Sequence, residues 1–378
     1  MKTNQLILAA ALVALAACTK ENVDFNANTL DNEIGFTAVT RKATKANNAI
    51  IDGTTYDHSN TFKVWGWNSA AGTFADVTDE AASNFMSGIE ISWTKGREGV
   101  NSTRPEAWRN ASQYYYWPYS GKISFLAIHP STIVPTTTVW DGQNTKPKAT
   151  INNYTICEDD PATTDVNEDN STTDLMFATA AGSRSTGLDT DGNLPMQFKH
   201  ALSQIAVYVK TDADYTVDNV RFDIDGVTFN GIDLTGSVTY ENDAISWGAT
   251  GAQTASWVYS NATKANITNT AALYGNPIVM IPQDANKLGD NDTNQTTITI
   301  NYTMAQGGVE TSDYIEVVAP WLKVKEGPTD YNPAEAIPGW EAGKKYNYTL
   351  NFKLKEILFS PSVTDWVEVD LQTVNANI

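Results

Sequence analysis

Short segments in which apolar and polar residues alternate dominate the chain after its first twenty residues. These segments are rich in Val, Ile, Tyr, Phe and Trp, and clusters of Ser, Thr, Asn, Asp and Gly separate them. Apolar stripes with the period of a helix are almost absent. An alternation of period two predicts strands with one buried face and one face toward water, as in an all-β sandwich. We expect such strands at 62–67, 123–129, 205–209, 298–302 and 346–352.

The first of these strands shows how the faces divide. Phe62 and Val64 share one face, and Trp65 and Trp67 share the other. The next strand alternates in the same way and is expected to end at His129, before a proline.

The first residues have the pattern of an export signal. A cation at Lys2 is followed by an apolar run that is too short to span a bilayer, and the run ends in small residues. The sequence Leu15-Ala16-Ala17-Cys18 resembles the bacterial lipobox, in which Cys becomes the first residue of the mature protein. We therefore expect residues 1–17 to be a signal peptide and Cys18 to carry lipid that anchors the chain in a membrane. An ordinary signal peptide with a chance cysteine is the alternative.

Composition narrows the choice of partners. The length of the chain after the signal peptide suggests roughly two domains. The formal net charge of −19 makes the chain a poor partner for nucleic acid. Besides Cys18 there is one cysteine, Cys157, which we expect to be a lone thiol in a loop because no partner is left for a disulfide.

A loop-rich stretch divides the chain. Residues 155–193 are dense in Asp, Thr, Asn, Gly and Ser, and they interrupt the alternation. Within them, residues 189–193 faintly resemble the start of a calcium loop, but the glutamate expected at the end is replaced by His200, so a surface turn is favoured. The predicted domains are residues 49–194 and 195–378.

No motif for catalysis is present. The sequence lacks HExxH, GxSxG, a P-loop and GxGxxG. The three histidines, His58, His129 and His200, are far apart in sequence, and His200 is expected to be a packed or capping side chain, not a ligand. We expect no enzyme activity, no metal and no cofactor.

Two aromatic clusters allow two interpretations. Residues 114–119 contain four tyrosines and a tryptophan, and residues 65–67 contain two tryptophans. Exposed rings in a row could stack on sugars. Packing in the core, with some rings at an interface, is the favoured interpretation because aromatic side chains bury much surface.

Several motifs, taken in order, resemble the fimbrillin family of pilin-like lipoproteins from Gram-negative gut and oral bacteria. These motifs are FKVWGW at 62–67, YWP at 116–118, DLMFA at 174–178, MQFKHALSQI at 196–205, WEAGKKYNY at 340–348 and VTDW at 363–366. The resemblance runs from about Ile34 to Trp366. It implies two transthyretin-like β-sandwich domains in tandem and a role as a structural subunit of a type V pilus that serves adhesion.

The resemblance also implies an assembly route. A trypsin-like, Arg-directed protease removes the lipidated segment with the first β-strand, and a strand of another pilin subunit fills the opened groove. The partners would be other pilin subunits, the protease, the lipid of the outer membrane and surface ligands on host or bacterial cells. The product would be an extracellular fimbria.

The sequence carries candidates for the removable strand and its cleavage site. Residues 18–48 would form the leader, and its alternating inward residues are Ile34, Phe36, Ala38 and Thr40. Arg41 directly follows and is the preferred cleavage position, with Lys42 and Lys45 as lesser candidates, because a basic residue in a loop-like segment is readily cut.

The C-terminus carries a candidate donor strand at 367–378. Val367, Val369 and Leu371 share one face, and acidic residues lie between them. Such a strand can add to an open sheet edge. An ordinary last strand of the second domain is an equally weighted alternative. A lipid-anchored, carbohydrate-binding surface protein is the alternative function.

Overall fold

The structure is a computed structural model of the chain. It describes residues 32–40, 56–69, 85–94, 106–140, 146–156, 174–248, 255–259, 267–284, 297–318, 325–326, 330–331, 339–352 and 357–365. Nearly all regular structure in these residues is β-strand, and the short 3-10 turn η4 (Thr216–Asp218) is an exception. The all-β prediction is confirmed. In the described part of the chain, no helix is long and apolar enough to cross a membrane.

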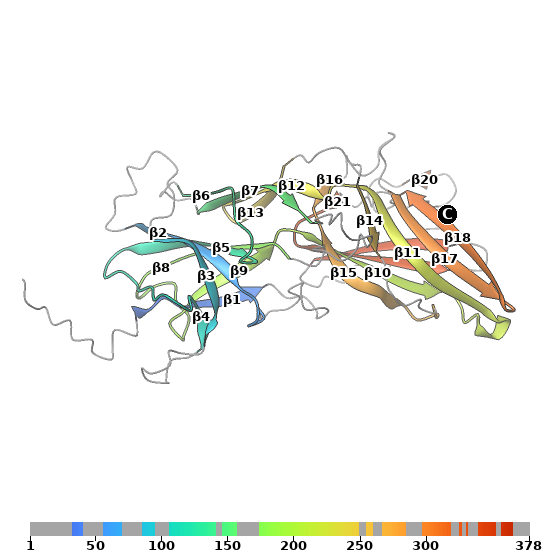
Figure 1. The fold of residues 1–378 in the computed structure, drawn as a ribbon, viewed down its shortest axis with the longest axis horizontal. Coiled ribbons are helices and arrows are strands. Elements are labelled where there is room, and N and C mark those ends of the chain that lie inside the picture. The colour runs from blue at the N-terminus through green and yellow to red at the C-terminus, as the bar shows by residue number, and fades with distance from the viewer. Residues whose placement is uncertain are drawn as a thin grey trace, which may run out of the picture.

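A closed barrel forms the N-terminal lobe (Figure 1). In order around the barrel, its strands are β1 (Phe36–Thr40), β4 (Ala107–Arg109), β3 (Met86–Thr94), β2 (Phe62–Ser69), β5 (Lys122–His129), β8 (Met176–Gly182) and β9 (Leu194–His200). All described pairs in the barrel are antiparallel except β1 with β9, which are parallel. The first strand in the described part of the chain, β1, therefore closes the barrel by pairing with β9, the last barrel strand in sequence.

Two four-stranded sheets form the C-terminal lobe. One has the order β15 (Ala272–Met280), β10 (Ser203–Thr211), β22 (Lys344–Phe352) and β23 (Ile357–Asp365). The other has the order β14 (Ala255–Tyr259), β11 (Val220–Ile232), β17 (Thr297–Gln306) and β18 (Val309–Val318). Two small strand pairs complete the described part of this lobe: β16 (Gln283–Asp284) with β21 (Gly339–Trp340), and β19 (Lys325–Glu326) with β20 (Asp330–Tyr331).

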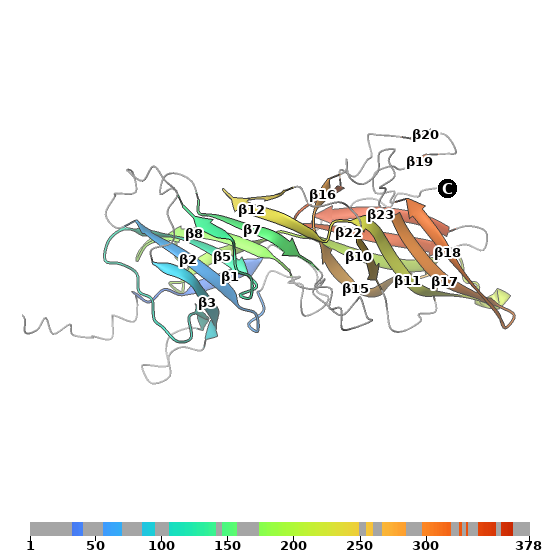
Figure 2. The same cartoon turned by 45° about the horizontal axis from the view of Figure 1, so that its top comes forward.

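A third four-stranded sheet joins the two halves of the sequence. Its order is β13 (Ala244–Trp247), β12 (Thr235–Glu241), β7 (Lys148–Thr155) and β6 (Thr137–Val139). Figure 2 shows β12 beside β7, and the register pairs Val238 with Ile151. A hairpin from the second half of the chain thus extends the N-terminal lobe.

The lobes do not divide at the predicted boundary. The prediction separated residues 194 and 195, but β9 starts at Leu194 and pairs with β1 and β8. The barrel therefore continues to His200. The loop-rich residues before 194 connect β8 to β9 within the barrel, so their composition does not mark the end of the barrel. The transthyretin-like topology of each half stays a prediction.

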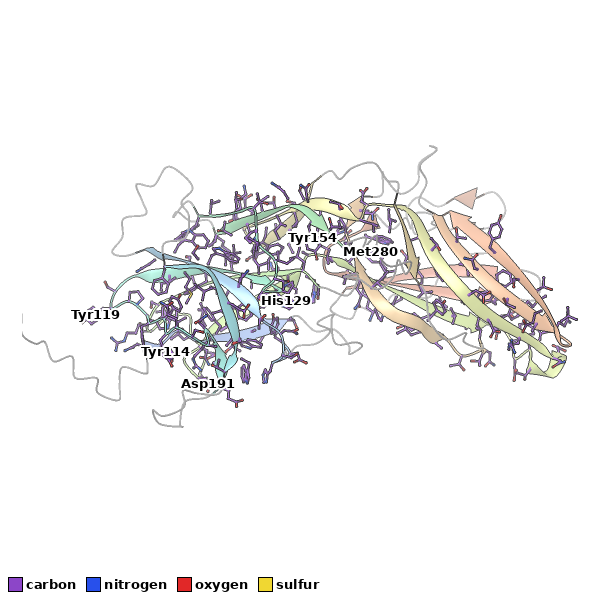
Figure 3. The ribbon with its side chains drawn as sticks, in the orientation of Figure 1. Tyr114, Tyr119, His129, Tyr154, Asp191 and Met280 are labelled. Atoms are coloured by element: carbon purple, nitrogen blue, oxygen red, sulfur yellow. The ribbon has the colours of Figure 1, made fainter. Side chains whose placement is uncertain are left out.

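The residues that the structure describes form two hydrophobic cores. The first fills the barrel and contains Phe36, Phe62, Phe125 and Phe198. The second begins between the barrel and the β6–β7–β12–β13 sheet and continues into the C-terminal lobe. Tyr154 and Met280 both belong to this second core, and Figure 3 shows them near the junction of the lobes.

Strand β2 lies between these cores and is buried on both faces. Its Phe62 and Val64 enter the barrel core, and its Trp65 and Trp67 enter the second core. The predicted division of faces is correct, but the expectation of one wet face is wrong for this strand. The β6–β7–β12–β13 sheet covers the face that a single sheet would expose to water.

Candidate functional site

Strand β1 has two different edges. Along one edge it pairs with β9 over five positions, from Phe36↔Leu194 to Thr40↔Phe198. Along the other it meets β4 at a single position, Phe36↔Trp108. The leader thus depends on β9 for most of its pairing.

The residues just before β1 extend the second edge. The Ile34 N–H donates to the Tyr115 carbonyl at 2.7 Å, and the Trp117 N–H donates to the Asn32 carbonyl at 2.7 Å. Glu33 and Tyr116 form an antiparallel bridge between these bonds. Residues 32–40 therefore occupy a slot with β9 on one side and β4 with residues 115–117 on the other, which we call the acceptor groove.

The inner face of the groove is apolar and tightly filled. Ile34, Phe36, Ala38 and Thr40 are all buried, and Phe36 is 1% exposed. The Phe36 ring lies 5.3 Å from the Phe125 ring and 6.3 Å from the Phe62 ring. All four residues of the predicted removable strand thus lie on the inner face, where Ile34, Phe36 and Ala38 belong to the barrel core and Thr40 is buried.

The outer face carries a polar cluster that the sequence analysis missed. Arg109 and Glu33 are 7% and 8% exposed, and their Nε and Oε2 atoms lie 3.9 Å apart. Asn193 is 4% exposed, and a Cβ added at Gly35 would lie 2.3 Å from its Oδ1. We call Glu33, Gly35, Arg109 and Asn193 the outer-face cluster. Strand parity could have placed Glu33 and Gly35 on this face, since they alternate with Ile34 and Phe36, but it could not have indicated Arg109 or Asn193.

The turn at 189–193 holds this cluster in place. The Asp189 carboxylate accepts hydrogen bonds from the N–H groups of Asp191 (3.0 Å) and Asn193 (2.9 Å). Thr37 of β1 donates its hydroxyl proton to the same carboxylate. The segment is a turn, as predicted, but it also covers the outer face of β1, which its sequence did not reveal.

Gly35→Ala is expected to destabilise the barrel. The new Cβ would meet Asn193 Oδ1 at 2.3 Å and two Arg109 nitrogens at 3.2 Å, so side chains of a buried cluster must shift. Overpacking of this kind costs roughly 1–3 kcal/mol of the free energy of unfolding. Chemical denaturation of the intact chain would measure it. Gly226→Ala is the matched control, because a Cβ added there has Asn301 Nδ2 at 3.9 Å as its nearest contact. An equal loss of the free energy of unfolding in both variants would contradict the packing of the cluster.

The aromatic run at 114–119 borders the groove. Trp117 is 5% exposed, whereas Tyr114, Tyr116 and Tyr119 are 38%, 42% and 92% exposed. Figure 3 shows Tyr114 and Tyr119 on the barrel lobe. The tryptophans of both aromatic clusters are buried, so packing accounts for those rings. Of the exposed tyrosines, Tyr116 pairs with Glu33 beside the leader, which favours an interface role for this ring over sugar stacking.

Buried histidines lie elsewhere in the barrel. His129 Nδ1 shares a hydrogen bond with the Tyr56 hydroxyl and lies 3.0 Å from the Thr61 carbonyl. His200 is packed, as predicted, and its Nδ1 lies 2.6 Å from Asp174 Oδ2. Both imidazoles are closed to solvent, so their polar contacts are structural. Within the described residues, no group of three His, Cys, Asp or Glu side chains is arranged to hold a metal ion.

Burial of His129 predicts acid sensitivity. Burial lowers the pKa of His129 to about 4, below the ordinary value of 6.5. Between these values the unfolded chain binds more protons than the folded one, so the free energy of unfolding falls as the pH falls. From pH 7 to pH 5 this group should remove about 2 kcal/mol.

His129→Gln provides the control for that prediction, since glutamine does not titrate. Denaturation of both proteins at pH 7 and pH 5 should show a smaller acid loss in the variant. Equal losses would mean that His129 is not held neutral.

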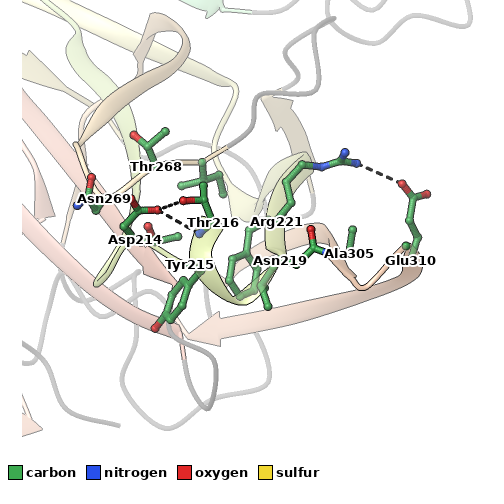
Figure 4. A pocket seen from close by; sticks show the side chains of 14 residues that line it. Asp214, Tyr215, Thr216, Asn219, Arg221, Thr268, Asn269, Ala305 and Glu310 are labelled. Carbon is green, nitrogen blue, oxygen red and sulfur yellow. Dashed lines mark hydrogen bonds and ion pairs between the residues drawn. The ribbon is translucent and has the colours of Figure 1, made fainter.

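A polar hollow of about 540 Å³ lies in the C-terminal lobe and is lined by residues between Thr211 and Glu310 (Figure 4). Its polar groups largely satisfy one another: the Thr216 hydroxyl donates to Asp214 at 2.6 Å, and Arg221 contacts Glu310 at 3.2 Å. It has the character of a surface turn, not of a site prepared for a ligand.

Several predicted site residues lie outside the described residues. These are Cys18, Arg41, Lys42, Lys45, Cys157, Val367, Val369 and Leu371. In sequence, Arg41 directly follows the end of β1, and Val367 comes two residues after the end of β23 at Asp365. The predictions about these residues stay predictions.

Comparison with known proteins gives one family. The model of the fimbrillin-like family matches residues 40–366. A fimbrial protein of known structure from Bacteroides vulgatus shares the fold, with a TM-score of 0.55, 16% identity, and coverage of 89% of this chain and 99% of that one. A cell adhesion protein from Bacteroides ovatus matches at a TM-score of 0.47, with 14% identity and coverage of 89% and 99%. No curated protein sequence matches the chain.

Proposed function

This chain belongs to the fimbrillin-like family, and from that premise we propose that it is a fimbrial subunit that polymerises by exchange of a β-strand between copies. Membership supports a role in fimbriae at the cell surface, in adhesion and in association with other fimbrial subunits. The proposal adds the route by which the subunits join.

The position of β1 is the observation that carries the proposal. It is the first strand of the barrel, it closes the barrel, and its last residue, Thr40, is followed in sequence by Arg41. A cut at Arg41 would separate residues 32–40 from the chain while leaving every other barrel strand covalently intact. Few strands in a closed barrel can be removed by a single cut.

Removal of the leader would leave a groove that needs a new strand. Backbone N–H and C=O groups of β9 would lose partners, and an open edge of this kind tends to pair with another chain. The inner face would also expose the space now filled by Ile34 and Phe36. Each fully buried apolar side chain contributes roughly 1.5–3 kcal/mol, so a replacement strand with similar side chains would bind firmly.

The C-terminal segment has the required alternation. Val367, Val369 and Leu371 could fill the inner face while main-chain hydrogen bonds form along the edges. We propose that this segment of one subunit enters the acceptor groove of the next. Because the donor and acceptor surfaces of a subunit are different, the contact is heterologous, and it generates a filament when the repeated rotation does not close into a ring.

Export as a lipoprotein precedes this step in the proposal. Lipid on Cys18 would hold the precursor in the outer membrane while the leader keeps the groove filled. A trypsin-like protease acting at Arg41, or at Lys42 or Lys45, would release the subunit for assembly. Premature polymerisation is thereby avoided.

Limited proteolysis tests the proposal. Purified chain (residues 19–378) should be monomeric, and an Arg-specific protease should convert it into high-mass polymers, measured by light scattering and electron microscopy. N-terminal sequencing should find polymer subunits that start at Lys42. The variant Arg41→Gln is the control and should resist conversion by that protease. Complete cleavage after Arg41 without polymers would overturn the proposal.

A further inference from the structure

The acceptor groove contains a buried cation that faces a carboxylate of the leader. Arg109 lies on β4, one residue after Trp108, so Trp108 points into the barrel and Arg109 points to the outer face. Its side chain is 8% exposed, and the side chain of Glu33 is 7% exposed. Asn193 of the turn at 189–193 lies on the same face beside Gly35 and is 4% exposed.

Removal of the leader takes Glu33 away and leaves Arg109 behind. The open groove admits water to Arg109, but an incoming strand covers it again, and burial of the guanidinium opposite a residue without a negative charge is strongly unfavourable. A strand that brings a carboxylate to the same place would restore the pair, whereas a neutral or basic residue there would not. Such an arrangement discriminates between incoming strands.

We infer that Arg109 selects the incoming strand by charge, and that the strand it selects is the acidic C-terminal segment of a second copy of this chain. This inference rests on the proposed strand exchange. It adds that Arg109 determines which strand enters the groove and in which register that strand pairs.

One register satisfies both faces of the groove. With Glu368 in the place of Glu33, Val369 and Leu371 take the places of Ile34 and Phe36 on the inner face. Asp370 then falls at the place of Gly35, where an added Cβ lies 3.2 Å from both Nε and Nη2 of Arg109. The two carboxylates would flank the guanidinium.

This register requires one adjustment. The Asn193 Oδ1 lies 2.3 Å from a Cβ at position 35, so the Asn193 side chain must rotate away. In the intact chain nothing compensates for that movement. When the donor strand of a second copy occupies the groove, its carboxylate beside Arg109 compensates for the movement of Asn193. The movement that destabilises the Gly35→Ala variant is therefore tolerated when the incoming residue is acidic.

Polymerisation of full chains tests the inference. After cleavage, the variant Glu368→Gln/Asp370→Asn should need at least about 30-fold more protein than the unaltered chain for half of the subunits to assemble. This variant leaves the groove untouched, so it remains informative if Arg109 variants fail to fold. The control Glu241→Gln/Glu310→Gln removes two exposed carboxylates and should assemble like the unaltered chain.

A charge swap completes the test. Arg109→Glu chains and Glu368→Lys/Asp370→Lys chains should each assemble poorly alone, whereas cleaved mixtures should form joints in which the Arg109→Glu chain accepts the lysine-bearing strand. Equal assembly of the neutral variant and the unaltered chain would overturn the charge selection and leave strand exchange standing. No assembly of the unaltered chain would instead overturn strand exchange itself.

Discussion

Phe36→Asp is expected to make the intact chain associate without any cleavage. Phe36 is 1% exposed and packs against Phe62 and Phe125, so an aspartate there would place an unpaired carboxylate in an apolar core. Loss of a buried Phe costs about 3–5 kcal/mol, and burial of the charge adds to this. Since β1 precedes the other barrel strands, its departure relieves the strain while the rest of the barrel persists. Light scattering of the uncut chain should show oligomers.

Val39→Asp is the matched control for this prediction. Val39 lies in the same strand, is partly buried and alternates with the inward residues Ala38 and Thr40. Its variant should stay monomeric and should keep β1 in the groove. A monomeric Phe36→Asp chain with an intact barrel would show that β1 is not the element that blocks association.

Deletion of residues 367–378 is expected to abolish polymerisation after cleavage while leaving the monomer folded. Strand β23 pairs with β22 up to the pair Lys344↔Asp365, so the described part of its sheet is complete before Val367. The deleted chain should unfold at the same temperature as the full chain. Cleavage and light scattering should then show monomers, because the groove is open but no donor is present.

Two comparisons decide between donor and ordinary last strand. Deletion of 375–378 alone retains the alternating residues and should preserve assembly. Cleaved chains that lack residues 367–378 should stop polymer growth when they are mixed with cleaved full-length chains. The shortened chains can accept a strand but cannot donate one. A large loss of thermal stability on deletion of 367–378, with assembly retained, would favour the ordinary last strand.

Local alternation was enough to find many strands and their inward residues. The division of Phe62 and Val64 from Trp65 and Trp67 was correct, and Tyr346, Tyr348, Leu350 and Phe352 are all buried on β22. In these segments the side-chain pattern along one strand directly reports the two faces of that strand.

Features that depend on distant pairing were not predictable in the same way. The parallel pairing of β1 with β9 joins residues far apart in sequence, and the β12–β13 hairpin adds to β7 from the other half of the chain. No local pattern encodes either contact. For this reason the second buried face of β2 and the continuation of the barrel past residue 194 appeared only in the structure.

The outer-face cluster shows the same limit at the candidate site. The prediction named the apolar residues of β1 because alternation reveals them, but Arg109 and Asn193 come from distant segments. Their proximity to Glu33 and Gly35 follows from register, which is a property of the whole barrel.

A disulfide that locks β1 in the groove tests the central claim most directly. Val39 and Gln197 are partners in the β1–β9 register, so Val39→Cys/Gln197→Cys in a Cys157→Ser background can form a bridge of ordinary span. Asn301→Cys/Tyr314→Cys, between β17 and β18, is the control bridge because it leaves β1 free.

After cleavage at Arg41, the oxidised lock should remain monomeric by light scattering and should polymerise when reduced, whereas the control should polymerise in both states. Polymerisation of the oxidised lock at the rate of the reduced protein would contradict the account, because strands would then join without β1 leaving its place.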